Sequence, residues 1–208
     1  GVGKTNVSWV EGTSYAEELN IKKAVKAARN VDQIVICLGE EPATEKPSDI
    51  DELELPDAQM ALVKALAETG KPITLVLVQG RPRIIREIEP LADAILMAYL
   101  PGNEGGRAVA DILFGKAQPS GKLPFTYPRF SGSIWTYDHT KADRRDKGFG
   151  FEAFDPQYEF GYGLSYTTFS YENLKLSHDS LPINDTLQIE VEVKNTGERT
   201  GKEVVTVF

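Results

Sequence analysis

Short apolar runs alternate with amphipathic stretches between residues 14 and 114, and this alternation restricts the fold more than any other feature. Three runs have the length and composition of strands, at residues 34–38, 73–78 and 94–98. Helical spacing of apolar residues predicts helices at about residues 14–30, 57–68, 83–91 and 104–114. Strands separated by helices pair in parallel through crossover connections, so the sequence predicts a layered α/β sandwich with a mostly parallel sheet.

Local signals refine this expectation at three places. Ser14 and Glu17 have the spacing of a capping box, which places the start of the first helix there. The run at residues 34–38 is apolar at every position, which predicts a strand buried on both faces and Cys37 packed as a small hydrophobic side chain. The loops that follow Leu38, Val78 and Ala98 all leave the carboxyl edge of the sheet, where ligands bind in such folds.

The pattern changes after Gly121. Residues 122–165 are rich in proline, glycine and aromatic residues without periodicity, which is typical of a long connector. From Thr186 apolar and polar residues alternate strictly, and residues 204–208 begin another strand. This is the pattern of an antiparallel β-sandwich, which needs about 100 residues. We therefore expect an incomplete sandwich at this end and, since the chain begins at Gly1 without a methionine or a signal-like segment, a piece of a longer protein.

Charge and composition exclude several classes of function. The net charge is −8, and the densest basic cluster, at residues 141–147, is interleaved with acids, which argues against nucleic-acid binding. No apolar run approaches the roughly 20 residues of a membrane-spanning helix. The single cysteine excludes disulfide frameworks and clustered cysteine zinc sites. We expect no cofactor and no membrane span.

Other candidate sites have weak patterns. Residues 1–5 resemble the end of a phosphate-binding loop, but such a loop functions only between an upstream strand and a downstream helix. The acids at residues 49–54 lack the glycine and final glutamate of a calcium loop, and neither His139 nor His178 has a second ligand at metal spacing. The acidic loop at residues 39–49 is more informative. A carboxylic acid in a partly desolvated cleft can act as a general acid, although a solvated acidic loop explains the composition equally well.

Six blocks of sequence form a recognisable series, at residues 40–56, 80–82, 99–106, 110–115, 119–124 and 160–166. They closely resemble the β-glucosidase type of family 3 glycoside hydrolases, in the order that the family has them. The resemblance implies three parts: a barrel domain, an α/β sandwich and a fibronectin III-like domain. On this basis residues 1–125 are expected to form the α/β sandwich, 126–165 a connector, and 166–208 the beginning of the fibronectin III-like domain. The barrel would precede Gly1.

The resemblance also implies a reaction, the hydrolysis of terminal non-reducing β-D-glucosyl residues with retention. Members of the family have an aspartate nucleophile on the barrel and, in many, a glutamate acid/base in a Thr-Glu-x-x-x-Asp loop. That loop corresponds to residues 44–49, so Glu45 is the expected acid/base. The chain differs from the common pattern at Ala43, where relatives often have an aromatic residue, and at Pro47-Ser48, where Pro-Gly is frequent.

The expected partners are a β-linked oligosaccharide or glucoside and the barrel domain of the same protein. The resemblance places the complete enzyme in the periplasm or outside the cell, as part of polysaccharide degradation. The choice among glucose, xylose and N-acetylglucosamine and the oligomeric state stay open. A non-catalytic sugar-binding or scaffold module is the alternative, because the nucleophile is not expected within these residues. A nucleotide-binding domain is a weaker option.

Overall fold

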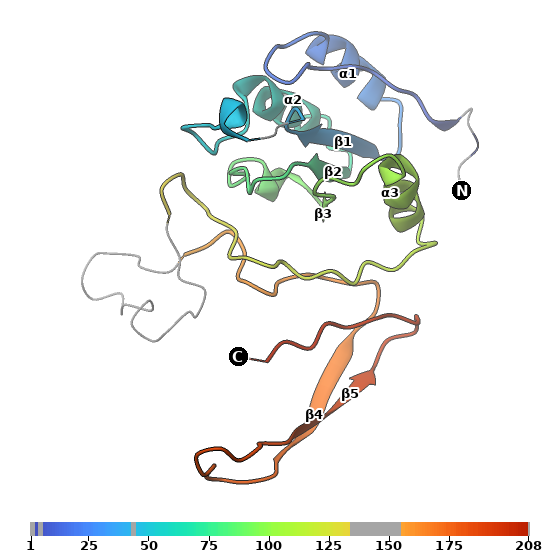
Figure 1. Ribbon diagram of the computed structural model, residues 1–208. Helices are drawn as coiled ribbons and strands as arrows, with labels where there is room; N and C mark the ends of the chain where they lie inside the picture. Colours follow the sequence, from blue (N-terminus) through green and yellow to red (C-terminus); the bar gives the residue numbers. More distant parts are fainter. Residues whose placement is uncertain (1–2, 4–5, 43–44, 134–154, 208) are drawn as a thin grey trace, which may run out of the picture.

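A computed structural model of the chain describes residues 3, 6–42, 45–133 and 155–207 (Figure 1). Its elements, in chain order, are α1 (Ile21–Ala28), β1 (Ile34–Gly39), the short 3₁₀ helix η2 (Lys46–Ser48), α2 (Asp57–Ala67), β2 (Ile73–Val78), the 3₁₀ helix η3 (Glu89–Leu91), β3 (Ala94–Met97), α3 (Gly105–Leu113), β4 (Phe169–Leu176) and β5 (Ile189–Asn195).

The first three strands form a parallel sheet in the order β1-β2-β3, which confirms the predicted α/β architecture. Ile34 pairs with Ile73 and Thr74 with Ala94, so the three strands end at one edge. Helices α1 and α2 cover one side of the sheet, and α3 lies on the other side (Figure 1). This arrangement brings the loops after β1, β2 and β3 together, as the alternation of strands and helices predicted.

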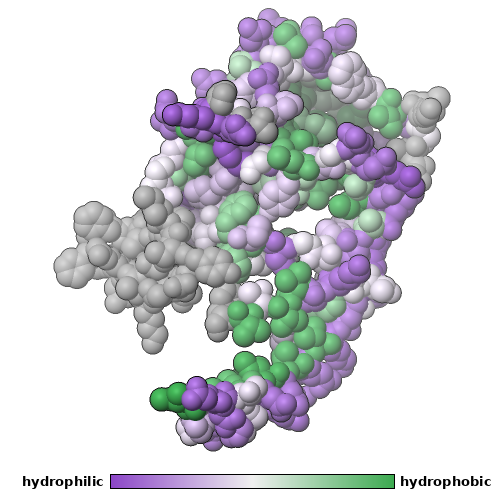
Figure 2. Space-filling model, in the orientation of Figure 1, coloured by the Kyte–Doolittle hydropathy of each residue, from purple (hydrophilic) through white to green (hydrophobic). Residues whose placement is uncertain are grey.

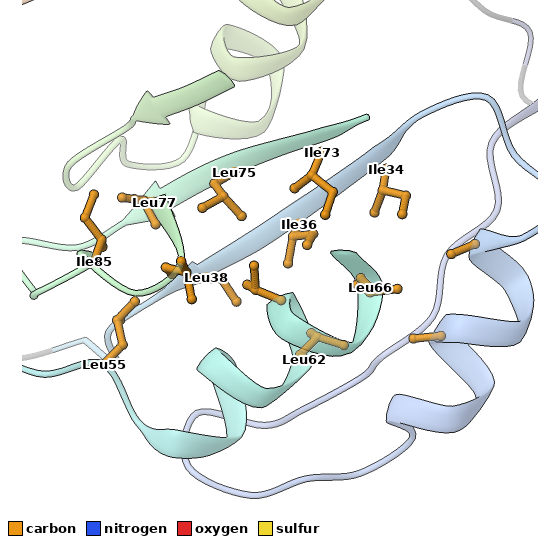
Figure 3. Packing of buried hydrophobic residues seen from close by; sticks show 14 of the residues in the cluster. Ile34, Ile36, Leu38, Leu55, Leu62, Leu66, Ile73, Leu75, Leu77 and Ile85 are labelled. Carbon is orange, nitrogen blue, oxygen red and sulfur yellow. The ribbon is translucent and has the colours of Figure 1, made fainter. Parts of the chain in front are cut away.

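The core lies between the sheet and α2. In Figure 3 the labelled side chains of β1 and β2 point toward Leu62 and Leu66 of α2. The central strand β2 is buried along almost its whole length, with Leu75 and Leu77 fully inaccessible to solvent. Replacing a large apolar side chain at such a site would lose its transfer free energy and leave a cavity, so the burial of β2 stabilises the base of the loop that follows it.

Strand β1 differs from the prediction of burial on both faces. Ile34, Ile36 and Leu38 are buried, but Val35 is 47% exposed and Cys37 is also exposed. The strand occupies the edge of the described sheet, and Val35 and Cys37 alternate with the buried residues, so they lie on the face turned away from the core. An uninterrupted apolar run therefore does not guarantee two buried faces.

Two predicted helices also need correction. Ser14 and Glu17 close a tight turn instead of capping a helix: Ser14 N–H donates to Glu17 O at 2.9 Å, Glu17 N–H donates to Ser14 Oγ at 3.0 Å, and α1 begins only at Ile21. A capping-box spacing satisfies the same two donors in either structure, so it does not identify a helix by itself.

The helix expected at residues 83–91 is reduced to η3. Ile84 bridges to Glu54 in parallel, and Ile84, Ile85 and Ile88 are all buried. These three isoleucines have the spacing of one helical face. They lie instead on an irregular segment that enters the core. Arg83 is buried too and donates to backbone carbonyls of the preceding loop, which fixes this extended path.

The antiparallel pair β4–β5 follows α3 in the order of elements (Figure 1). Between them, the described residues 114–133 and 155–168 contain no named helix or strand, and Tyr127 bridges to Tyr158. The rest of the predicted connector, residues 134–154, lies outside the described residues. The alternating segment forms β5 as predicted, whereas residues 204–207 are not assigned to a strand.

The β4–β5 pair exposes its apolar residues. Figure 2 shows apolar side chains gathered over the lower part of the molecule, and every residue of β5 is exposed, including Ile189, Val191 and Val193. A two-stranded ribbon with an uncovered face is at best marginally stable on its own.

We therefore expect amides of β5 to exchange at least about 100-fold faster than those of β2 in native-state hydrogen exchange of the 208-residue chain. Measurement at several protein concentrations separates local opening from protection by association. Protection of β5 equal to that of β2 in a monomer would contradict this expectation.

Candidate functional site

A cleft opens at the carboxyl edge of the parallel sheet, where the loops after β1, β2 and β3 meet. Its volume is about 550 Å³, and it is lined by Glu40, Glu41, Glu45, Lys46, Ser48, Asp49, Gly80, Arg81 and Leu100. The strand-end loops identified in the sequence therefore do meet. The acidic loop contributes most of the lining, and the segments after β2 and β3 close its other side.

Glu40 anchors the base of this cleft. Its side chain is only 5% exposed, and its Oε2 accepts hydrogen bonds from the backbone N–H groups of Gly80 at 3.1 Å and Arg81 at 3.0 Å. Its Oε1 accepts from Arg81 Nε at 2.8 Å and lies 2.8 Å from Arg81 Nη2 and 3.0 Å from Arg83 Nε. Both oxygens of Glu40 are therefore engaged in joining the end of β1 to the end of β2.

The two arginines extend this junction in different directions. Arg81 Nη1 donates to the carbonyl oxygen of Ser48 at 2.6 Å, on the acidic loop. Arg83 Nη1 donates to the carbonyls of Glu52 at 2.9 Å and Glu54 at 3.2 Å, and its Nη2 donates to the Tyr15 hydroxyl. Together they hold the segment from Ser48 to Glu54 against the end of β2.

A buried hydrogen-bonded pair supports the junction from below. Tyr127 is 1% exposed; its hydroxyl donates to the Arg83 carbonyl oxygen at 2.5 Å and accepts from Gln79 Nε2 at 2.9 Å. Burial raises the pKa of Tyr127 above its usual range, although the Gln79 hydrogen bond opposes the shift. A tyrosine hydroxyl with a pKa of about 10 or higher is neutral at physiological pH, so Tyr127 keeps the proton that it donates.

Glu45 lies on the outer part of the loop, is exposed, and lines the cleft. It immediately precedes η2, and its backbone has φ 59° and ψ −166°. This region of φ/ψ space is essentially a glycine region, and a non-glycine residue persists there only when its surroundings hold it. Glu45 is thus displayed to the cleft by a strained turn, whereas Glu40 is sequestered beneath it.

The segment after β3 supplies an apolar wall. Tyr99 also has a positive φ, 53°, and burial raises the pKa of its hydroxyl. The next residue, Leu100, is 68% exposed and lines the cleft, and a Cβ added at Gly80 would lie 3.4 Å from its side chain. An exposed leucine beside carboxylates gives the cleft both a polar and an apolar face.

Sequence analysis identified the loop and Glu45 but missed the parts played by Arg81 and Arg83. The sequence did contain a clue to these roles. Arg81 lies in the Gly80-Arg81-Pro82 block that follows β2, with Arg83 directly after it, at the same sheet edge as the acidic loop. Among the described residues there is no group of three or more histidine, cysteine or acidic side chains arranged to hold a metal ion. Nor does that part of the chain include a helix long and apolar enough to cross a membrane.

Known proteins of one family match this sequence over most of its length. Residues 2–166 match the model of the glycosyl hydrolase family 3 C-terminal domain. The chain is 39% identical over 199 residues to a periplasmic beta-glucosidase of Salmonella typhimurium, covering 90% of this chain and 26% of that protein. It is 38% identical over 199 residues to a beta-xylosidase of Formosa agariphila, covering 94% and 27%.

A solved structure shows the same fold. The crystal structure of a beta-glucosidase from Listeria innocua in complex with glucose matches with a TM-score of 0.77 and 31% identity, over 91% of this chain and 28% of that one. The chain thus spans about a quarter of the length of these relatives. With the family model matched over residues 2–166 and the same α/β fold in a solved relative, the chain belongs to glycosyl hydrolase family 3, whose C-terminal domain it contains.

Proposed function

We propose that this chain is the part of a retaining β-glycosidase that supplies the general acid/base, Glu45, for hydrolysis of terminal non-reducing β-D-glucosyl residues. The observation that carries the proposal is the contrast within one loop. Glu40 has both oxygens engaged by neighbouring donors, whereas Glu45 is exposed at the cleft. Of these two carboxylates, Glu45 is the accessible one, which supports its assignment as the acid/base.

The chemistry needs a second carboxylate. In a retaining glycosidase the nucleophile and the acid/base stand about 5–5.5 Å apart, on either side of the scissile bond. We propose that a barrel domain of the same protein provides an aspartate nucleophile. Glu45 would first give its proton to the departing glycosidic oxygen. As the carboxylate, it would then take a proton from the water that releases the glycosyl-enzyme.

Glucose is the proposed sugar because the Salmonella and Listeria relatives are named as beta-glucosidases. The Formosa relative is named as a beta-xylosidase, so xylose is the second candidate. The Salmonella protein is described as periplasmic, which supports a periplasmic or extracellular location for the complete enzyme.

We also propose that residues 166–208 begin a fibronectin III-like domain, after an α/β domain at 1–125 and a connector at 126–165. The antiparallel β4–β5 pair and the exposed apolar residues of β5 support this assignment. A sandwich would cover them with a second sheet.

The function is tested by assaying the complete protein on aryl β-D-glucosides and aryl β-D-xylosides, with the anomer of the first-formed sugar followed by NMR. We expect β-product, glucoside preference, and no turnover by the 208-residue chain alone. First-formed α-product would contradict the retaining mechanism. A complete protein that binds sugar but hydrolyses neither substrate would favour the non-catalytic module.

A further inference from the structure

The turn that displays Glu45 is short and begins at a strained residue. η2 is a three-residue 3₁₀ helix, closed by Ser48 N–H donating to Glu45 O and Asp49 N–H donating to Lys46 O, each at 3.0 Å. Glu45 itself has φ 59°. A short turn with a strained first residue keeps its shape only when contacts from outside hold it.

Arg81 supplies such a contact across the cleft. Its Nη1 donates to Ser48 O at 2.6 Å, at the last residue of η2, while its Nε donates to Glu40 Oε1 at 2.8 Å. Glu40 is itself fixed by the backbone N–H groups of Gly80 and Arg81. One planar guanidinium therefore joins the Glu45 turn to a rigid point at the ends of β1 and β2.

We propose that Arg81 is a positioning residue for the general acid/base: it acts through the Ser48 carbonyl to keep Glu45 at the distance and angle at which it can transfer a proton. This inference rests on the proposed role of Glu45. A lysine at this position could retain the charge opposite Glu40. It could not reproduce the fork that reaches a carboxylate and a carbonyl at the same time, because an ammonium is a compact point charge.

The structural part of the proposal is tested on the 208-residue chain. In Arg81→Lys and Arg81→Gln, the amides of Ser48 and Asp49 are expected to exchange at least about 10-fold faster than in the wild type, while β2 amides keep their protection. Arg86→Gln is the matched control. Arg86 has a similarly exposed side chain, 36% against 31%, also faces a loop glutamate, Glu54, at 3.7 Å, and lies over the ring of Phe130 at 4.8 Å; none of these interactions involves η2.

The catalytic part is tested in the complete enzyme. A displacement of about 1 Å can cost about 10²-fold in rate, so Arg81→Lys is expected to lower kcat by about that factor on a glucoside with a poor leaving group. KM should change little. The loss should be smaller on a highly activated aryl glucoside, and azide should restore part of it there, because azide needs no deprotonation to release the glycosyl-enzyme. A purely structural defect would lower kcat equally on both substrates, and azide would not restore it.

The outcomes separate this proposal from the proposed function. Unchanged Ser48 and Asp49 exchange in both Arg81 variants, or a uniform loss of turnover without azide rescue, overturns the positioning role. Wild-type turnover by Glu45→Ala on a poor leaving group instead overturns the proposed function, even if Arg81→Lys releases the turn. If Arg81→Gln fails to fold, Arg81→Lys, which keeps the positive charge, still decides the question.

Discussion

Glu45→Ala in the complete enzyme is expected to lower turnover of a glucoside with a poor leaving group by about 10²–10⁴-fold, the usual contribution of general acid catalysis. An alkoxide leaves slowly without a proton, and the variant has no acid to supply it. A highly activated aryl glucoside needs little protonation, so its glycosylation step should be nearly normal. The release of the glycosyl-enzyme should still be slow, because the base is missing, and azide should accelerate it.

The neighbouring Glu41 provides the control for this experiment. Glu41 is exposed, lines the same cleft and precedes Pro42, which favours an extended backbone at Glu41. Glu41→Ala should keep turnover close to that of the wild type on both kinds of substrate. If Glu41→Ala loses activity on the poor leaving group and Glu45→Ala keeps it, the assignment of the acid/base is wrong.

Glu40→Ala should act on stability instead of chemistry. Its removal leaves Arg83, whose side chain is only 4% exposed, without its carboxylate, and also deprives Arg81 and two backbone N–H groups of an acceptor. Breaking a buried ion pair by removing one partner typically costs about 3–5 kcal/mol. We expect the free energy of unfolding of the 208-residue chain to fall by about that amount in urea denaturation.

Glu41→Ala is again the control, since an exposed substitution usually changes stability by less than about 0.5 kcal/mol. A loss below about 1 kcal/mol in Glu40→Ala would show that the two arginines find other partners or water. It would then be wrong to describe Glu40 as the anchor of the loop.

The elements that sequence analysis predicted well are those whose packing agrees with their local pattern. β2 lies at the predicted residues because each of its positions is apolar or β-branched and the strand is central. α2 begins at Asp57, as predicted, and its apolar face packs on that strand. In both cases local propensity and tertiary contacts favour the same structure.

The errors occur where tertiary contacts override the local pattern. Ile84, Ile85 and Ile88 have spacing compatible with a helix, but the segment is held in an irregular path by Arg83 and by the bridge from Ile84 to Glu54. Nothing near Arg83 in the sequence indicates that its partners lie about thirty positions earlier, at Glu52 and Glu54. Similarly, Val35 and Cys37 are apolar but exposed, because exposure depends on what covers the strand.

The candidate site was predictable in outline only. The alternation of strands and helices indicated which loops meet, and the family resemblance indicated Glu45. The junction of Glu40 with Arg81 could not be derived from spacing, because these residues are 41 positions apart and become neighbours only when β1 pairs with β2. The strained backbone of Glu45 also has no sequence signature, since glutamate rarely adopts it.

The acidic loop has a buried end that stabilises the fold and exposed positions that do not, and the two should differ in how well they tolerate mutation. Its inner end, at Glu40, is tied to the fold, whereas Glu41 and Lys46 are exposed at the cleft and their side chains are not part of that junction. Mutations at these outer positions can accumulate with little loss of stability, so a directed-evolution library can sample them without unfolding the domain. The inner end remains under selection for folding, and diversity in the loop should be sought at Glu41 and Lys46, with Glu40 and Glu45 kept.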